Sequence, residues 1–303
     1  MITATKATKK FGNIAALNEI SCTIPPGCIY GMVGSNGAGK STFLRLISGI
    51  YKSDGGTVTI NDKDIFNNPD VKKTISFVPD ELFFLPGASM NRMAKLYASV
   101  YDSFDYGRFE NLTGTFKLDP SRSINTFSKG MKRQASIILS LACRTQYIFF
   151  DETFDGLDPV MRNLTKNIIS DDIINRNATA IITSHSLREL EDTCDQLSLL
   201  HNGGIVFESD IENIKTSLFK IQTAFNYDYE QSLFEGINII NYGKRGSVCN
   251  MIIRGSRDET EEKIKTLKPV LLDILPLSLE EVFIYEMEAL GYSFKDILGE
   301  ESA

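Results

Sequence analysis

The arrangement of apolar and polar positions predicts alternating strands and helices over most of the chain. Apolar runs with the length of buried strands stand at residues 29–33, 147–150 and 178–183. Apolar residues recur at helical spacing over 42–50, 89–101, 131–143 and 160–169. Buried strands separated by amphipathic helices are typical of an α/β fold with a parallel sheet.

The pattern changes beyond about residue 215. Short alternating runs predict strands at 218–225, 237–241, 247–254 and 270–275, with helices near 258–267 and 279–290. No group of chemically active residues stands out in this part. We therefore expect two domains, a larger α/β domain over residues 1–215 and a small accessory α+β domain over residues 216–303.

Composition excludes several classes of protein. The net charge of −7 and the isoelectric point near 5.1 argue against general affinity for nucleic acid. Five scattered cysteines without CxxC spacing favour reduced, packed thiols, as in the cytoplasm. The N-terminus has no apolar core of the signal-peptide type, and no apolar run approaches the about 20 residues that a spanning helix needs. If this protein acts at a membrane, another chain must supply the membrane part.

A glycine-rich loop follows the apolar run at residues 29–33. It fits the phosphate-loop pattern G-x-x-x-x-G-K-[ST], with Lys40 and Ser41 at the last two positions. Glycines let backbone N–H groups surround a polyphosphate, while the lysine binds the outer phosphates and the serine hydroxyl ligates Mg²⁺. An accidental surface turn is the alternative, but the strand before and the helix after it argue against one. The predicted nucleotide-binding residues here are Gly34, Ser35, Asn36, Gly37, Ala38, Gly39, Lys40, Ser41 and Thr42.

Charged residues follow three other predicted strands. Asp151 and Glu152 end a buried run, where a carboxylate needs a cation, so we expect Asp151 to hold Mg²⁺ and Glu152 to polarise a water molecule. His185 follows the run at 178–183 on the same sheet edge, which favours a catalytic role over a structural one. Asp80 follows a strand at 74–78 and either meets the metal or water or is a solvated loop acid. Ser186 and Glu189 fit a capping box for the next helix.

Two further positions have an ordinary explanation beside a functional one. Ser128 precedes the helical run at 131–143, and its N-cap would leave N–H groups free for a second phosphate, although most helices with a serine cap bind nothing. Phe11 stands before a glycine in polar surroundings, where packing beneath a turn is commoner than contact with a ligand.

Taken together, the motifs GSNGAGKS, FSKGMKRQ, YIFFDE, DGLDP and TSH resemble those of the ATP-binding cassette (ABC) ATPases, in the order found there. The resemblance covers residues 1–215 and implies a P-loop NTPase core with an antiparallel β subdomain and a helical subdomain at about 85–145. It implies that Phe11 stacks on adenine and Asp158 belongs to the loop that crosses the dimer. Ser128 and Gly130 would contact ATP held by the opposite subunit, and His185 would sense the terminal phosphate.

Three positions depart from the family pattern. Asp80 replaces the glutamine that follows the corresponding strand, which puts its contact with metal and water in question. The signature motif reads SKGM in place of SGGQ, and Thr153 replaces the proline after the catalytic acid.

The resemblance implies an ATPase subunit that binds ATP and Mg²⁺ and forms a homo- or heterodimer with a second ABC subunit. It would power separate integral membrane permease subunits, bind no nucleic acid and lie on the cytoplasmic face of the cell membrane. The ending SLEEVFIYEM and the short helical insert are similar to those of single-cassette exporters. The alternatives are a soluble ABC ATPase acting on nucleic acid or ribosomes, and a weakly hydrolysing nucleotide sensor. The transported substrate and the role of residues 216–303 stay open.

Overall fold

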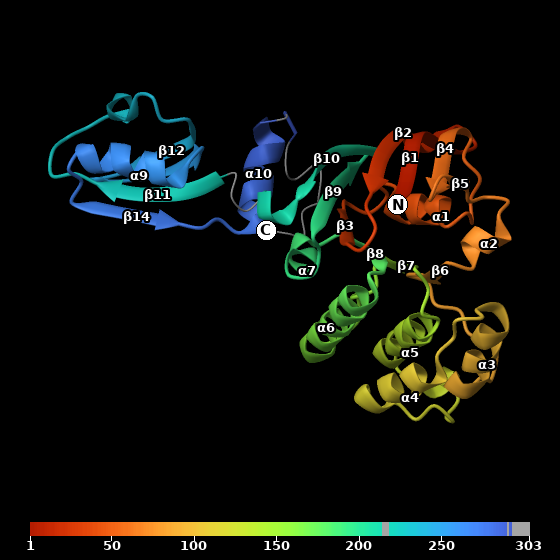
Figure 1. The fold of residues 1–303 in the computed structure, drawn as a ribbon. Coiled ribbons are helices and arrows are strands. Elements are labelled where there is room, and N and C mark those ends of the chain that lie inside the picture. Colours follow the sequence, from red (N-terminus) through yellow and green to blue (C-terminus); the bar gives the residue numbers. More distant parts are fainter. Residues whose placement is uncertain (214–217, 290, 293–303) are drawn as a thin grey trace. The chain divides into compact units, whose positions relative to one another are not determined.

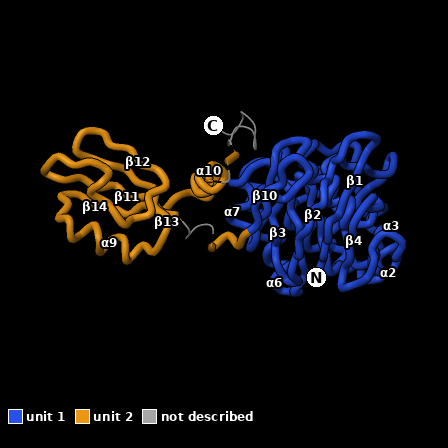
Figure 2. The backbone as a smooth tube through the Cα atoms, turned by 90° about the horizontal axis from the view of Figure 1, so that it is seen from above, with its two compact units in different colours: residues 1–208, 301–303 blue, residues 209–300 orange. Residues whose placement is uncertain are grey.

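A computed structural model describes residues 1–213, 218–289 and 291–292 of the chain. The chain divides into two compact units, one formed by Met1–Glu208 and the other within Ser209–Glu300 (Figure 2). The domain boundary expected near residue 215 falls in 214–217, outside the described residues.

The first unit contains two sheets. The smaller one has the strand order β2-β1-β4-β5, with antiparallel pairs throughout. Its strands are β1 (Ile2–Phe11), β2 (Ile14–Ile24), β4 (Gly55–Ile60) and β5 (Lys63–Asp64). The N-terminal amino group ties this sheet to the larger one, because it donates a hydrogen bond of 2.9 Å to the hydroxyl of Tyr147.

The larger sheet has the strand order β10-β9-β3-β8-β7-β6, and the pairs from β9 to β6 are parallel. Its strands are β3 (Ile29–Val33), β6 (Ile75–Val78), β7 (Tyr147–Asp151), β8 (Thr179–Ser184), β9 (Gln196–His201) and β10 (Gly204–Asp210). Parallel strands end at one edge, so the residues after β3, β6, β7 and β8 come together there.

Helix α1 (Lys40–Ile47) joins the two sheets into one core. Phe43 of α1, Leu17 of β2 and Phe149 of β7 belong to the same buried cluster, and each is 0% exposed. Burial of such large apolar side chains is the main force that holds these layers together. The phosphate loop is therefore anchored at both ends in the core of this unit.

Three helices form a separate layer beside β6 (Figure 1). They are α3 (Met90–Val100), α4 (Tyr106–Thr115) and α5 (Lys129–Ala142), with a short 3₁₀ helix η1 (Ile124–Thr126) before α5. Helix α5 contacts α3, α4 and β6, and its Ser140 hydroxyl donates to the Ser76 hydroxyl at 2.8 Å. The other helices of the unit are α2 (Pro69–Lys72), α6 (Pro159–Arg176) and α7 (Leu187–Glu191).

Two expectations about helices were incomplete. The polar stretch before Ser128 contains α4, which the apolar pattern missed because Gly107 and Gly114 interrupt it and only a narrow face with Phe109 and Leu112 is buried. Helix α6 extends to Arg176, beyond the expected end at residue 169. It ends where Asn177 takes a left-handed conformation, which asparagine tolerates well.

The second unit is a four-stranded antiparallel sheet with helices, in the order β12-β13-β11-β14. Its strands are β11 (Leu218–Ala224), β12 (Ile239–Arg245), β13 (Val248–Arg254) and β14 (Leu271–Leu275). Its helices are η2 (Gln231–Phe234), α9 (Arg257–Thr266) and α10 (Leu279–Ala289). Ile264 of α9 packs with Phe219, Ile221 and Met251 in a core of its own.

The predicted fold class is confirmed: an α/β core with an antiparallel β part and a helical part, followed by a small α+β unit. Within the described residues, no helix combines the length and the apolar character needed to cross a bilayer.

Candidate nucleotide site

The glycine-rich loop is a narrow backbone turn between β3 and α1. Gly39 has φ of +111° at the N-cap of α1, and a Cβ atom there would lie 2.7 Å from the carbonyl oxygen of Ala16. A Cβ atom on Gly34 would lie 2.3 Å from the carbonyl oxygen of Leu200. Both positions therefore exclude a side chain, as a loop that wraps its backbone around phosphates requires. Asn36 and Gly37 at its tip are exposed.

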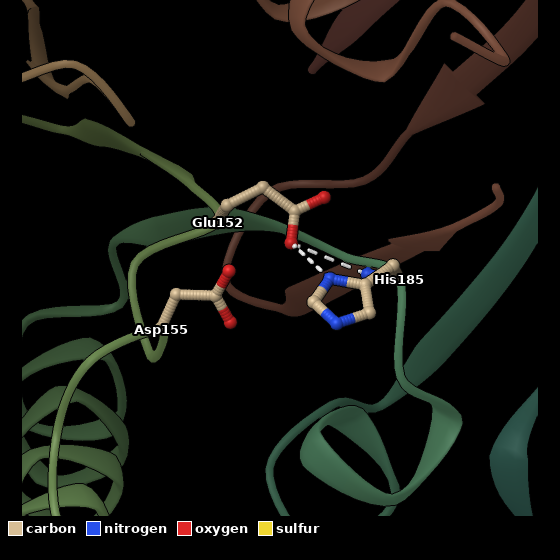
Figure 3. A group of neighbouring side chains, drawn as sticks. All are labelled: Glu152, Asp155 and His185. Atoms are coloured by element: carbon tan, nitrogen blue, oxygen red, sulfur yellow. Dashed lines mark hydrogen bonds and ion pairs between the residues drawn. The ribbon is translucent and has the colours of Figure 1, made fainter. Parts of the chain in front are cut away.

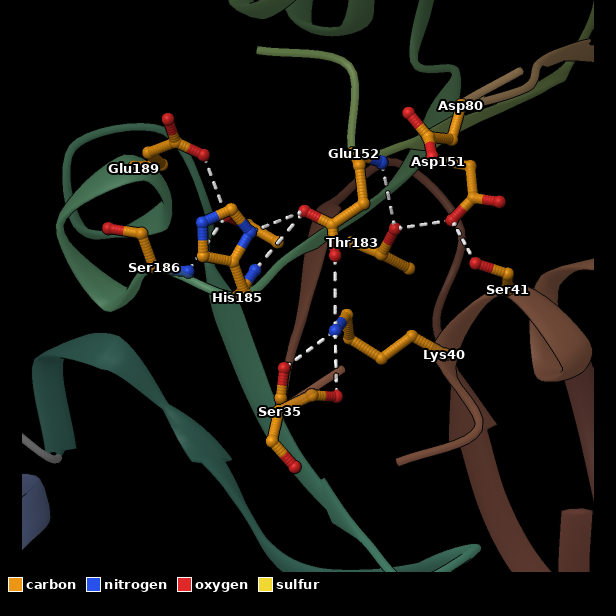
Figure 4. A network of polar contacts seen from close by, with 12 residues as sticks. Ser35, Lys40, Ser41, Asp80, Asp151, Glu152, Thr183, His185, Ser186 and Glu189 are labelled. Atoms are coloured by element: carbon orange, nitrogen blue, oxygen red, sulfur yellow. Dashed lines mark hydrogen bonds and ion pairs between the residues drawn. The ribbon is translucent and has the colours of Figure 1, made fainter. Parts of the chain in front are cut away.

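Lys40 lies in this loop, and its side chain is only 5% exposed. Its ammonium group donates to the carbonyl oxygens of Gly34 at 2.6 Å and Ser35 at 3.2 Å. It also forms an ion pair with Oε1 of Glu152 at 3.1 Å (Figure 4). The cation of the loop and the acid at the end of β7 thus meet at the same sheet edge.

Asp151 is completely buried at the end of β7 and has one satisfied and one unsatisfied oxygen. Its Oδ1 accepts hydrogen bonds from the hydroxyls of Ser41 and Thr183, each at 2.9 Å (Figure 4). Its Oδ2 is buried without a hydrogen-bond partner among the described residues. Burial raises the pKa of the Asp151 carboxyl, although the bonds from Thr183 and Ser41 oppose that shift. A buried carboxylate oxygen without a partner, next to a serine hydroxyl, fits the hard oxygen ligation that Mg²⁺ prefers.

Glu152 is held by its backbone as well as by its side chain. Its φ of +45° lies in the left-handed region, which is unfavourable for glutamate, and its N–H donates to Thr183 Oγ1 at 3.1 Å. Its Oε2 accepts from the backbone N–H of His185 at 3.3 Å and lies 3.0 Å from His185 Nδ1. Backbone strain of this kind is concentrated at functional sites because the surrounding structure must enforce it.

Glu152 affects the titration of His185. Partial burial of the imidazole opposes its charging, but the hydrogen bond to Glu152 and the charges of Glu152 and Asp155 prevail and raise the pKa of His185. Asp155 completes a small group with these two residues (Figure 3). One ligand atom from each of the three lies within 4.8 Å of the others, a spacing from which a metal ion could be held after small side-chain movements.

Asp80 also lies at this sheet edge, but its carboxylate pairs with Arg133. Val78 pairs with Phe150 in the register of β6 and β7, so Asp80 and Asp151 follow adjacent strands. Asp80 Oδ1 lies 3.0 Å from Nη2 of Arg133, a residue of α5, and its side chain is 56% exposed. The structure therefore places Asp80 near the acids and in an ion pair that the sequence pattern did not indicate.

Two of the remaining predicted residues, Ser128 and Asp158, each cap the N-terminus of their own helix. The third, Gly130, lies close to the loop that precedes α6. Ser128 accepts from the N–H of Met131 at 3.2 Å and thereby caps α5 as expected. Asp158 accepts from the N–H groups of Val160 and Met161 at 3.1 and 3.0 Å and caps α6. A Cβ atom on Gly130 would lie 3.1 Å from the carbonyl oxygen of Gly156.

Phe11 lies at the end of β1 and is 45% exposed. Its ring makes an edge contact with Tyr51 at a centroid distance of 5.3 Å, and the ammonium of Lys9 lies 5.6 Å from its centroid. The ring is therefore braced on one side and open to solvent on the other, so simple packing beneath a turn does not describe it.

The expected capping box at Ser186 and Glu189 is wrong. Ser186 caps α7 without a side-chain hydrogen bond. The carboxylate of Glu189 instead accepts from the Ser184 hydroxyl at 2.6 Å and pairs with Arg162 at 3.2 Å. The Ser184 hydroxyl in turn accepts from the N–H of Ser186 at 3.0 Å, which provides the bond that the glutamate was expected to make.

Sequence analysis missed two residues that shape the site. Thr183 bridges Asp151 and the backbone of Glu152, and Arg133 holds Asp80. Thr183 stands one position before the end of a buried strand, in the TSH motif, which could have drawn attention to it. Arg133 gave almost no signal, because it stands among other polar residues, Lys132 and Gln134, at the start of the helix.

Comparisons with known proteins agree with the geometry. The sequence profile of the family described as "ABC transporter" matches residues 17–155. The ABC transporter ATP-binding protein YtrB of Bacillus subtilis is 31% identical over 284 residues, which cover 94% of this chain and 97% of YtrB. The daunorubicin/doxorubicin resistance ATP-binding protein DrrA of Streptomyces peucetius is 28% identical over 226 residues, covering 69% of this chain and 65% of DrrA.

A solved structure shows the same fold. It is a dimeric ATP-binding cassette in a post-hydrolysis state with ADP and Pi, and it matches with a TM-score of 0.64 at 19% identity. The match covers 70% of this chain and 99% of that structure. Together with the phosphate loop and the acids at the end of β7, these matches show that the chain belongs to the ATP-binding proteins of ABC transporters and is an ATPase.

Proposed function

We propose that this chain is the ATP-hydrolysing subunit of an ABC exporter, with Glu152 as the general base. The observation that carries the proposal is the position of Glu152 between Lys40 and His185, with Asp151 beside it. A base, a phosphate-binding cation and a metal-binding acid at one sheet edge are the groups that phosphoryl transfer to water requires.

The residues of the site fit ATP with Mg²⁺. Ser41 and Asp151 would hold the ion, and Asp80 is a further candidate ligand if it leaves Arg133. When bound, Mg²⁺ supplies positive charge that stabilises the phosphate oxygens. Gly34–Thr42 would surround the phosphates, and Phe11 would stack on the adenine.

Lys40 and His185 act on Glu152 in different ways. A triphosphate attracts the Lys40 ammonium more strongly than one carboxylate does, so nucleotide binding is expected to draw Lys40 away from Glu152. Glu152 then loses a neutralising cation and becomes a better acceptor for a proton from water. His185 keeps the carboxylate in place through two contacts to Oε2, and its other ring nitrogen is available for the terminal phosphate.

We further propose that two chains close on two ATP molecules. Ser128 and Gly130 begin α5, and the N-terminus of a helix this long favours bound phosphate. A dimer would place this end of α5 against ATP in the opposite subunit, and Asp158 would lie in the loop that crosses between subunits. The dimeric cassette with ADP and Pi offers a precedent for such a pair.

The transport role rests on relatives. YtrB is named as an ABC transporter component, and DrrA is named for resistance to daunorubicin and doxorubicin, which suits export. We propose that this chain lies on the cytoplasmic face of the membrane and drives separate permease subunits. Residues 1–215 would form the ATP-binding domain and residues 216–303 an accessory domain.

The experiment is to purify the parent and the Glu152→Gln variant and to measure ATP binding, hydrolysis and oligomeric state. The variant should bind Mg-ATP with near-parental affinity, hydrolyse it at least about a hundredfold more slowly and accumulate as dimers with ATP. Glu110→Gln, at an exposed position of α4, is the matched control. Undiminished hydrolysis by Glu152→Gln would refute the assigned base. Membrane extracts should yield the chain together with a permease, whereas recovery with salt-sensitive RNA would contradict the transport role.

A further inference from the structure

The Arg133 side chain is among the most deeply buried charged groups of the first unit. The residue is 2% exposed, although arginine is almost never buried without a partner. Its Nη1 donates to the carbonyl oxygen of Pro79 at 2.8 Å, and its Nη2 donates to Oδ1 of Asp80 at 3.0 Å. Both partners belong to the two residues that follow β6, so the guanidinium holds the start of this loop by its backbone and by its side chain.

Two of the three acids at this sheet edge have a cation as partner. Asp80 follows β6, and Asp151 and Glu152 lie at the corresponding end of the adjacent strand β7. Three carboxylates at one sheet edge repel one another unless cations compensate them. Lys40 neutralises Glu152, and Arg133 neutralises Asp80. The acid at position 80, where the family has an uncharged glutamine, is thus matched by a buried arginine from another element.

Through helix α5, the ion pair between Arg133 and Asp80 can affect the N-terminus of that helix. Ser128 caps the helix five positions before Arg133, and the helix is fastened to β6 again by the buried bond between Ser140 and Ser76. Arg133 and the capped end at Ser128 lie on one continuous helix, Lys129–Ala142, and a helix is a rigid element through which two positions can be coupled. A displacement of Asp80 therefore has to break the ion pair or carry the N-terminus of α5 with it.

We propose that Arg133 is a positioning residue that acts on hydrolysis through Asp80, by fixing the loop after β6 to the Ser128 end of α5. The link would connect the loop after β6, which lies beside Asp151, to the α5 terminus offered to the opposite subunit. This inference rests on the proposed function for the role of Ser128, whereas the ion pair itself stands on the contacts above.

A double-mutant cycle tests whether Arg133 acts through Asp80. The proteins are the parent, Arg133→Gln, Asp80→Asn and the double variant, with Arg133→Lys as a milder change should Arg133→Gln not fold. In the parent background Arg133→Gln should lower kcat about tenfold and change KM less than about twofold. In the Asp80→Asn background the same change should lower kcat less than about threefold. Lys95→Gln removes a positive charge from an exposed position of α3, outside the site, and should leave kcat at the parental level.

Hydrogen exchange provides a readout that needs no activity. In the parent background Arg133→Gln should speed amide exchange about tenfold or more at Met131 and Lys132, whose N–H groups donate to Ser128, and far less in the Asp80→Asn background. The proposal would be overturned if Arg133→Gln changed kcat, or the exchange rates, by the same factor in the parent and in the Asp80→Asn background. It would also be overturned if Arg133→Gln had the kcat and the exchange rates of the parent. If the parent itself does not hydrolyse ATP, the proposed function fails, and the exchange cycle still decides whether Arg133 fixes the loop after β6 to α5.

Discussion

The ammonium of Lys40 lies 3.1 Å from Oε1 of Glu152, and His185 contacts the other oxygen of the same carboxylate. Lys40 and Glu152 have side chains only 5% and 11% exposed, so their charges interact with little screening by solvent. Glu152 therefore lies between Lys40 and His185, so that removing the charge of one of these residues changes the electrostatic environment of its neighbour. This coupling gives the site measurable properties before any ATP is added.

The first prediction concerns the titration of His185 in the protein without nucleotide. Glu152→Gln removes the charge that outweighs burial and should lower the pKa of His185 toward or below its usual 6.5. Lys40→Met leaves Glu152 without its cation and should raise that pKa further. NMR titration of the imidazole signals measures both shifts, with His201, the other of the 2 histidines, as an internal control. An unchanged His185 pKa in Glu152→Gln would contradict the proposed coupling.

The same pair predicts a pH dependence of stability. Because the pKa of His185 is raised on folding, its contribution is fully present below about 6.5 and is lost as the pH rises through the folded value. The stability difference between the parent and Glu152→Gln should therefore shrink across that interval. Urea unfolding at a series of pH values measures it, and a difference that grows with pH would be the wrong sign.

Asp151→Asn should make the protein more stable to unfolding and should lower its rate of ATP hydrolysis. An acid whose pKa is raised on folding stabilises the folded state only at low pH, and this contribution is lost as the pH rises through the folded value. At pH 7 the buried carboxylate is therefore costly. Its replacement should raise the unfolding midpoint by roughly 2–4 °C for each kcal/mol recovered. Calorimetry without nucleotide tests this, while hydrolysis should fall about a hundredfold or more. A lower midpoint would show that the carboxylate is compensated after all.

Phe11→Ala should weaken nucleotide binding without affecting the fold. The ring is 45% exposed and braced by Tyr51, as a stacking surface needs to be. Stacking of a base on an aromatic ring contributes about 1–3 kcal/mol, so the ATP dissociation constant should rise roughly 5- to 150-fold. Phe11→Tyr should retain affinity, and Ile14→Ala, at a residue 72% exposed nearby in sequence, should change nothing. Equal affinities of Phe11→Ala and the parent would remove Phe11 from the site.

Asp172 is predicted to be a stability hot spot. Its buried carboxylate pairs with Arg176 at 2.5 Å, Arg144 at 3.2 Å and Arg108 at 3.4 Å, which join α6 to α4 and to the end of α5. Asp172→Asn leaves three cations without their shared anion and should cost about 3–5 kcal/mol. Asp171→Asn, at the exposed adjacent position, should cost at most about 0.5 kcal/mol. Urea unfolding measures both, and similar values for the two variants would show that solvent screens the cluster.

Local sequence carried most of the information about the phosphate loop and its neighbours. The loop, the acids at the end of β7 and His185 were predicted because each depends on a short pattern: glycines between a strand and a helix, or a charge directly after an apolar run. Strands β3 and β7 were placed closely for the same reason. Helix α4 was missed because its apolar face is narrow and two glycines interrupt it.

By itself, the sequence determined which residues stand at the carboxyl ends of strands, because a strand is defined by its own consecutive side chains. Only the tertiary structure decided which of these charges meet. Arg133 lies 53 positions from Asp80, Thr183 lies 32 from Asp151, and Asp172 gathers arginines from separate segments. Which of these residues become partners depends on strand order, register and the burial of whole helices. Burial also excludes water from the charged groups, and this strengthens the interaction within each pair.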